Sequence, residues 1–265
     1  MKQRTIQLLE KIRTTAPLIH NITNYVVMNS SANILLALGA SPVMAHCEAE
    51  VEEMTAMAGA LVLNIGTLQQ DWVASMITAA KTANVRGIPV ILDPVGAGAT
   101  TLRTEAVKKI MGAAAVTVLR GNASEVLSLG SSEATTKGVD ASVGVTDAVV
   151  RAAGQIAGEM GCIVAISGEQ DCITDGDRVF RVSNGHPLMT RVTGIGCGLS
   201  AVTGAFCAVA AGERLEATAA AFGFYGLCGD LAVQVSELPG SFATSFVDCL
   251  YSTGAKEIDA LLNIS

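Results

Sequence analysis

The sequence is poor in aromatic residues and in charge. Phe, Trp and Tyr make up 4% of the 265 residues, charged residues make up 15%, and the formal net charge is -7. A nucleic-acid-binding protein needs a basic surface, and one that binds single strands also needs aromatic side chains on which bases stack. The composition therefore argues against a nucleic-acid partner. Half of the residues are apolar, which excludes an intrinsically disordered chain and suffices for the core of one domain spanning residues 1–265.

Several motifs that would assign a reaction are missing. No Gly-Lys dipeptide occurs, which excludes a Walker A phosphate-binding loop, and no G-x-S-x-G segment marks a hydrolase nucleophile. The three histidines, His20, His46 and His186, lie too far apart for an H-E-x-x-H zinc site. The seven cysteines include no C-x-x-C pair, so neither a disulfide framework nor a zinc site is predicted. We expect a reduced, cytoplasmic protein.

Charged residues are also missing from residues 192–212, a stretch long enough to cross a bilayer. Gly, Ala, Ser and Thr dominate this stretch, and Leu, Ile and Phe are few, so membrane insertion would be weakly driven. A buried core helix explains this composition better. The first residues carry Lys2, Arg4 and Glu10 and lack the uninterrupted apolar segment of a signal peptide. No membrane partner is expected.

Short apolar segments alternate with stretches of helical periodicity along most of the chain, as in an α/β fold with a mostly parallel sheet. The expected strands are 18–20, 41–44, 60–65, 89–93, 115–119 and 162–167. The expected helices are 2–14, 24–38, 49–57, 70–83, 101–111 and 146–159. Residues 171–174 and 178–182 flank an Asp-Gly-Asp turn and predict an antiparallel hairpin. Residues 130–142 are predicted to be a loop, and the chain beyond Gly196 is predicted to be mainly helical.

Polar residues stand beside glycines just past several of the expected strands. In an open parallel sheet, ligands bind at the carboxyl ends of the strands, so a site is expected there. The segments concerned are 64–66, 93–96, 120–122 and 167–169.

Two of these strand ends carry carboxylates, on Asp93 and on Glu125. Carboxylates on neighbouring strand ends can hold Mg²⁺ directly or through water molecules. The alternative is structural: Asp93 caps the following turn, and Glu125 lies in the first turn of a helix, where the helix dipole stabilises its charge. Arg120 lies near both and can pair with these acids or with a phosphate.

The segment Thr193-Gly-Ile-Gly-Cys-Gly198 precedes the long uncharged helix. Glycines let the backbone approach a ligand closely, and free N–H groups at a helix start bind anions. The alternative is a turn that merely begins a buried helix. At this position the helix dipole is expected to lower the pKa of the Cys197 thiol, although a structural cysteine also fits.

Four separated segments, in this order, resemble hydroxyethylthiazole kinases of the ribokinase-like superfamily. They are residues 17–29 (PLIHNITNYVVMN), 93–98 (DPVGAG), 120–125 (RGNASE) and 193–197 (TGIGC), and the resemblance extends over residues 5–260. It implies a three-layer αβα fold with a mostly parallel central sheet. It also implies ATP-dependent phosphorylation of the hydroxyl group of 4-methyl-5-(2-hydroxyethyl)thiazole, a step of thiamine salvage, by a homotrimer with active sites between subunits.

The resemblance also implies a role for individual residues. The thiazole alcohol would contact Asn24, Met44 and Gly194, and ATP would contact Arg120 and Ser167. The metal Mg²⁺ would be held at Asp93 and Glu125. The backbone amides of Gly194, Ile195, Gly196 and Cys197 would form an anion hole for the transferred phosphoryl group. Cys197 would be the catalytic residue, at a position where most of the superfamily carries Asp as general base.

Two other functions fit parts of the sequence. One is a related kinase that acts on hydroxymethylpyrimidine or pyridoxal, which Cys197 in place of Asp argues against. The other is a non-catalytic protein that binds a nucleotide or metabolite and keeps the fold. The complete set of Asp93, Arg120, Glu125 and the glycine-rich turn argues against this second alternative.

Overall fold

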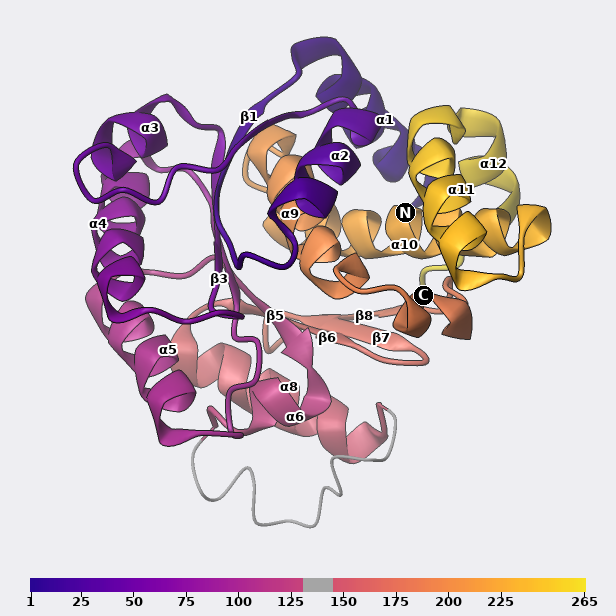
Figure 1. Ribbon diagram of the computed structural model, residues 1–265. Coiled ribbons are helices and arrows are strands. Elements are labelled where there is room, and N and C mark those ends of the chain that lie inside the picture. The colour runs from indigo at the N-terminus through magenta and orange to yellow at the C-terminus, as the bar shows by residue number, and fades with distance from the viewer. Residues whose placement is uncertain (131–144) are drawn as a thin grey trace.

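The computed structural model describes residues 1–130 and 145–265 and is built around one twisted sheet (Figure 1). The sheet has eight strands in the order β2-β1-β3-β4-β5-β6-β7-β8. Their bounds are β1 Leu18–Ile22, β2 Ser41–Val43, β3 Ala60–Asn64, β4 Val90–Asp93, β5 Val118–Asn122, β6 Ile163–Ser167, β7 Asp171–Thr174 and β8 Val179–Val182. Neighbouring strands from β2 to β6 are parallel, whereas β7 and β8 form the predicted antiparallel hairpin at one edge.

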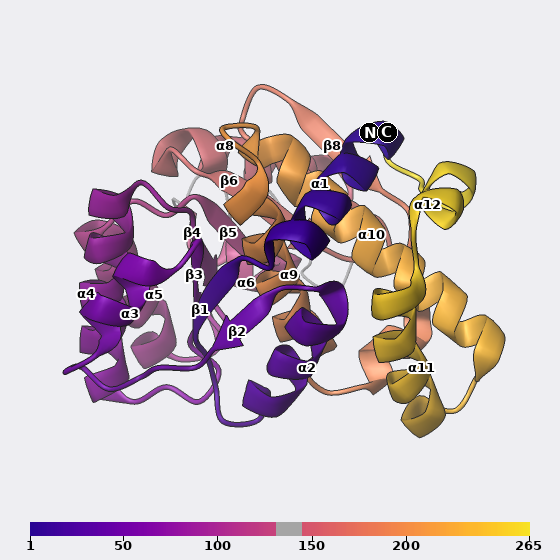
Figure 2. The same ribbon diagram turned by 90° about the horizontal axis from the view of Figure 1, so that it is seen from above.

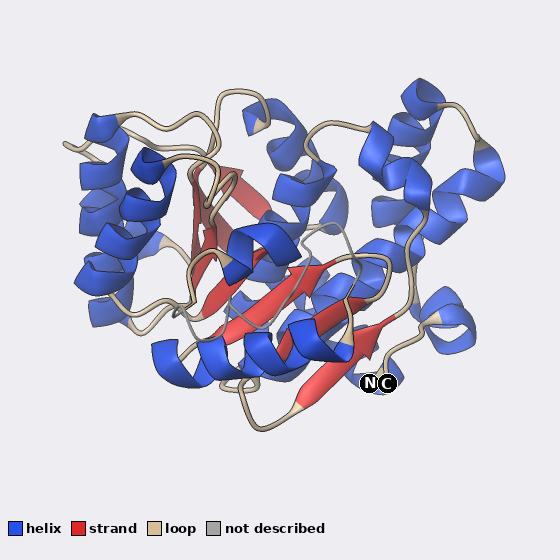
Figure 3. Ribbon diagram, turned by 90° about the horizontal axis from the view of Figure 1, so that it is seen from below, coloured by secondary structure: helices blue, strands red, loops and turns tan. Residues whose placement is uncertain are grey.

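Helices cover both faces of this sheet (Figures 2 and 3). One face carries α3 Val51–Met57, α4 Gln70–Arg86, α5 Thr101–Ala113, α6 Ala123–Leu127 and α8 Asp147–Met160. The other carries α1 Lys2–Thr15, α2 Met28–Leu38, α9 Ile195–Val209, α10 Arg214–Val235, α11 Pro239–Ser252 and α12 Ala255–Leu261, with the 3₁₀ helix η1 at Pro187–Arg191. Each face has its own hydrophobic cluster, so the three-layer αβα architecture is confirmed.

The uncharged stretch is the core helix α9, which packs on β1, β3 and β4. Its small residues allow a close approach: a Cβ on Gly204 would lie 2.8 Å from Cγ2 of Val62. Nearly all residues of α9 are buried, which explains the absence of charge. Among the described residues, no helix combines the length and the apolar character that a membrane crossing requires.

The structure corrects two predicted boundaries next to the site. The helix expected from Asn24 begins at Met28, because the Asn24 side chain accepts a hydrogen bond from Val26 N at 3.1 Å and holds a turn instead. Strand β5 extends to Asn122, so Arg120 lies within the strand rather than beyond it. The short helix α6 follows directly, so Glu125 lies in the first turn of a helix, as the structural alternative for this residue has it. The loop predicted at 130–142 lies outside the described residues, apart from its first residue.

Candidate active site

The carboxyl ends of the central strands bring the predicted residues to one edge of the sheet. Asn64 and Asp93 are register partners at the ends of β3 and β4, and Asn122 and Ser167 are register partners at the ends of β5 and β6. The N-terminus of α9 lies over the same edge, because Arg120 of β5 lies beside Gly196 in its first turn.

Asp93 is at the centre of a buried polar cluster. Only 1% of the residue is exposed, and its Oδ2 accepts hydrogen bonds from Asn64 Nδ2 at 2.8 Å and from Ser200 Oγ at 2.7 Å. Nη1 of Arg120 lies 3.7 Å from the same oxygen. Burial raises the pKa of Asp93 to about 6, against the opposing effect of the Arg120 charge. The other oxygen, Oδ1, is buried and accepts no hydrogen bond.

Arg120 connects Asp93 with the predicted ATP contact Ser167. Its Nη2 donates to Ser167 Oγ at 2.8 Å, and the residue is 6% exposed. A Cβ on Gly196 would lie 3.4 Å from Nη1, so the glycine leaves the guanidinium directly beside the first turn of α9. A positive charge and the N-terminus of a helix thus meet at one point, an arrangement suited to an anion.

The start of α9 keeps its backbone donors free of side-chain caps. Gly194, at φ +89°, is the N-cap residue and makes no side-chain cap, and the first helical hydrogen bond runs from Gly198 N to Gly194 O at 2.8 Å. The N–H groups of Ile195, Gly196 and Cys197 precede that bond and have no acceptor within the helix. The conformation requires glycine at position 194, where a side chain would also lie 2.8 Å from Ser30 Oγ.

Cys197 is half-buried and near both Asp93 and Asn24. Asn24 Nδ2 donates to its Sγ at 3.6 Å. The pKa of the thiol is raised to about 11, first by burial and then by the negative charge of Asp93. The expected lowering of this pKa is therefore wrong, because burial outweighs the helix dipole and Cys197 keeps its proton at neutral pH.

Glu125 has the structural role that the sequence left open. It forms a capping box with Asn122: Asn122 N donates to Oε2 at 2.9 Å, and Glu125 N donates to Asn122 Oδ1 at 2.9 Å. Its second oxygen, Oε1, accepts from Gly96 N at 2.8 Å, which joins the loop after β4 to the start of α6. The negative charge also raises the pKa of Asp93, so the two acids are electrostatically coupled.

No described contact joins the predicted residue Met44 to this cluster. It follows β2, the edge strand, and is half-buried. The cluster itself contains Asn24, Asp93, Arg120, Ser167 and Cys197 from the predicted set.

Two further cluster residues, Asn64 and Ser200, were not predicted as site residues. Asn64 stands among the polar strand ends, and Ser200 is three residues after Cys197, on the same side of a helix. These spacings were the available signals, although neither identifies the partner Asp93. Asp171, at the start of β7, also interacts with Arg120: burial raises its pKa to about 7, against the opposing effects of the hydrogen bond from Gly168 N and of the Arg120 charge.

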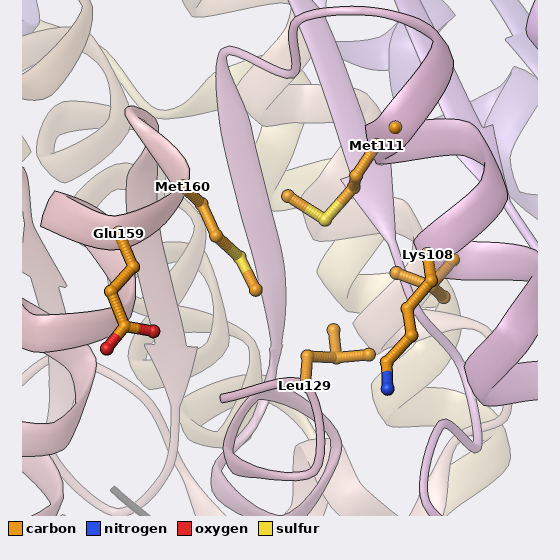
Figure 4. Close-up of a pocket in the computed structure, with 7 residues that line it drawn as sticks. Lys108, Met111, Leu129, Glu159 and Met160 are labelled. Carbon is orange, nitrogen blue, oxygen red and sulfur yellow. The ribbon is translucent and has the colours of Figure 1, made fainter. Parts of the chain in front are cut away.

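A separate pocket of about 330 Å³ lies between α5 and α8 (Figure 4). Met111 and Met160 point toward one another across it, and Leu129 lies below them. It contains none of the residues of the polar cluster. The chemistry of the sheet edge therefore does not extend into this pocket.

A family model described as the hydroxyethylthiazole kinase family matches residues 9–256. The chain belongs to this family. A hydroxyethylthiazole kinase from Desulfotalea psychrophila is 54% identical over 95% of this chain and 91% of its own length. Another, from Desulfosudis oleivorans, is 52% identical over 99% of this chain and 96% of its own length. The resemblance inferred from four short segments is thus confirmed over nearly the whole chain.

Solved structures agree with this assignment. The hydroxyethylthiazole kinase of Pyrococcus horikoshii OT3 superposes with a TM-score of 0.91, at 42% identity over 99% of this chain and 98% of that chain. A ribokinase-like superfamily protein from Enterococcus faecalis V583 gives 0.63 at 14% identity, over 94% and 95% of the two chains. The second similarity shows the fold alone, and this fold agrees with the expected three-layer arrangement.

Proposed function

We propose that this member of the family transfers a phosphoryl group from ATP to the hydroxyl group of 4-methyl-5-(2-hydroxyethyl)thiazole at the sheet edge around Asp93. The observation that carries the proposal is the meeting of Arg120 with the uncapped N-terminus of α9, next to the buried Asp93 carboxylate. Phosphoryl transfer mainly requires positioning and neutralisation of charge, and both elements serve these needs.

The alcohol lies, in this proposal, between Asn24, Gly194 and Met44, with its hydroxyl group near Cys197. The protonated thiol of Cys197 supports a role in orienting the hydroxyl group, whose proton passes late in a loose transition state to an oxygen of the transferred phosphoryl group. The backbone N–H groups from Gly194 to Cys197 receive the transferred phosphoryl group. Arg120 and Ser167 hold the ATP phosphates from the other side.

The residues present fit a Mg²⁺ ion that is held largely by phosphates and water. The buried Oδ1 of Asp93 has no hydrogen-bond partner and is available to such an ion or to its water shell, with Glu125 nearby. Within residues 1–130 and 145–265, no group of three His, Cys, Asp or Glu residues could hold a metal without the nucleotide. When bound, Mg²⁺ neutralises charge on the phosphate oxygens.

A homotrimer with the active site between subunits is the proposed assembly. Apolar side chains beside Asn24 support a covering subunit: Tyr25 is 56% exposed and Val26 is 64% exposed. Light scattering at several concentrations tests the assembly. A monomer that is fully active at assay concentration would contradict it.

An assay of ADP release with ATP, Mg²⁺ and a panel of alcohols tests the reaction. The panel contains hydroxyethylthiazole, hydroxymethylpyrimidine, pyridoxal and ribose. We expect turnover with hydroxyethylthiazole alone. Turnover with another alcohol would overturn the substrate, and nucleotide binding without any turnover would favour a non-catalytic protein.

Two substitutions test the role of Cys197. Cys197→Asp should keep or raise turnover, because aspartate can also orient the hydroxyl group and accept its proton, whereas Cys197→Leu should lose turnover. The half-buried Cys249 of α11 provides the matched control Cys249→Leu, which should leave turnover unchanged. Wild-type turnover in both Cys197 variants would remove this residue from the mechanism.

A further inference from the structure

Asn64 contacts both the proposed substrate side and the proposed metal side of the cluster. It is 1% exposed and stands at the end of β3. Its Oδ1 accepts from Asn24 Nδ2 at 2.8 Å and from Gly66 N at 2.9 Å, and its Nδ2 donates to Asp93 Oδ2 at 2.8 Å. A backbone donor on one side and a carboxylate on the other permit a single orientation of the amide. Asn64 therefore has a fixed direction and cannot flip.

The loop after β3 holds Asn64 and Asn24 tightly against each other. A Cβ on Gly66 would lie 2.5 Å from Asn24 Nδ2, so only glycine leaves room for that amide. Arg103 of α5 fixes the loop from outside, because it donates to Ile65 O at 3.1 Å and to Gly66 O at 2.7 Å. A shift of Asn64 would consequently displace Asn24, which also donates to Cys197 Sγ.

We infer that Asn64 is a positioning residue that sets the relative placement of Asn24, on the alcohol side, and Asp93, on the phosphate side. The inference rests on the proposed function of these two residues. Asn64 acts on the reaction through its neighbours Asn24, Asp93 and Cys197, in the way that residues behind metal ligands orient them. Substitutions can separate the hydrogen bonds that its Oδ1 accepts from the one that its Nδ2 donates to Asp93.

Asn64→Asp removes the hydrogen bond donated to Asp93 and keeps the hydrogen bonds accepted from Asn24 and Gly66. The isosteric carboxylate can still accept from Asn24 and from Gly66 N, but it places a second acid against Asp93 in place of a donor. We expect the KM for hydroxyethylthiazole to stay near the wild-type value, while kcat falls about 10- to 100-fold and more Mg²⁺ is needed for half-maximal rate. Asn64→Ala removes the hydrogen bonds to Asn24 and to Asp93, so kcat should fall and the KM for the thiazole should rise as well.

Calorimetry of thiazole binding in the presence of a non-hydrolysable ATP analogue and Mg²⁺ supplies a readout besides activity. Binding should weaken in Asn64→Ala and remain near wild type in Asn64→Asp. Asn21→Ala is the matched control: Asn21 is equally buried on β1, and its side chain donates to Ile19 O rather than to a residue of the cluster. This control should change melting temperature without changing KM or kcat of the folded enzyme.

Two outcomes would overturn the inference. One is wild-type kcat and KM per folded molecule in both Asn64 variants, which would make Asn64 merely structural. The other is equal weakening of thiazole binding in both variants, because the hydrogen bond with Asn24 would then have no effect on binding that differs from that of the bond with Asp93. Failure of the proposed function is distinguishable, since the wild-type protein itself would then neither bind nor phosphorylate the thiazole.

Discussion

Two helices begin at the same edge of the sheet, but side chains cap the free backbone N–H groups of only one of them. Helix α6 begins with a complete capping box, in which Asn122 and Glu125 satisfy each other's backbone donors. Helix α9 begins at Gly194 without any side-chain cap, and Arg120 lies beside its first turn. A cap stabilises a helix by about 1 kcal/mol, and α9 forgoes it where an anion is proposed to bind. The comparison separates a helix start that completes the fold from one that is open to a ligand.

The largest effect is expected from removing the charge at the open helix start. Arg120→Ala should lower kcat about 100- to 1000-fold, because the transferred phosphoryl group loses its main cationic partner and Asp93 loses its counter-charge. Steady-state ADP release, normalised to folded protein, measures the change. Arg178, in an exposed pair with Glu216, supplies the control Arg178→Ala. Near-wild-type turnover in Arg120→Ala would refute the assignment of the anion site to α9.

A smaller effect is expected when a methyl group is added at the uncapped N-terminus of α9. Gly196→Ala adds a methyl group 3.4 Å from Nη1 of Arg120 and should raise the KM for ATP about tenfold, equivalent to about 1.4 kcal/mol. The variant should not unfold more easily, since alanine favours a helix over glycine by about 0.5–1 kcal/mol. Gly112→Ala in α5 is the control, because a Cβ there meets no atom within 4 Å. Equal ATP KM values in the two variants would contradict this geometry.

In the capped helix α6, substitutions can separate the capping role of Glu125 from its proposed role near Mg²⁺. Asn122→Ala should lower the free energy of unfolding by about 1 kcal/mol through loss of the cap. Glu125→Gln keeps an oxygen that can complete the capping box, but its amide nitrogen cannot accept from Gly96 N. The stability should therefore fall modestly, while the Mg²⁺ concentration for half-maximal rate rises. Denaturant titration and Mg²⁺ titration measure the two effects. An unchanged Mg²⁺ response in Glu125→Gln would leave Glu125 with the capping role alone.

The smallest effect concerns pH. With a pKa of about 11, only about one Cys197 side chain in a thousand is a thiolate at pH 8, so turnover should show no thiol ionisation between pH 7 and 9. The unfolded thiol loses its proton near its ordinary pKa of 9.0, before the folded one, so stability should fall as pH rises from 9 to 11. Alkylation by iodoacetamide, followed by mass spectrometry, reports Cys197 directly. Rapid alkylation at pH 7 would contradict the raised pKa.

Most of the fold could be predicted, because alternation of apolar and periodic segments depends on local sequence. Asp93 was placed correctly at a strand end for the same reason. The partners of Asp93 could not be predicted: Asn64 and Ser200 are 29 and 107 residues away, and only the assembled sheet brings them together. The pKa of Cys197 was misjudged because the helix dipole is visible in the sequence, whereas burial beside Asp93 is not.

The close packing of α9 on the sheet limits how the substrate specificity of such an enzyme can change. Gly204 presses against Val62, about 13 Å along the helix from the active-site turn at a rise of about 1.5 Å per residue. The helix cannot tilt or slide to fit a larger alcohol without opening the hydrophobic core. New specificities are therefore more accessible through the loops at residues 24–27 and 44–47 than through α9. Natural and laboratory selection would thus alter the proposed acceptor pocket more readily than the proposed phosphate site.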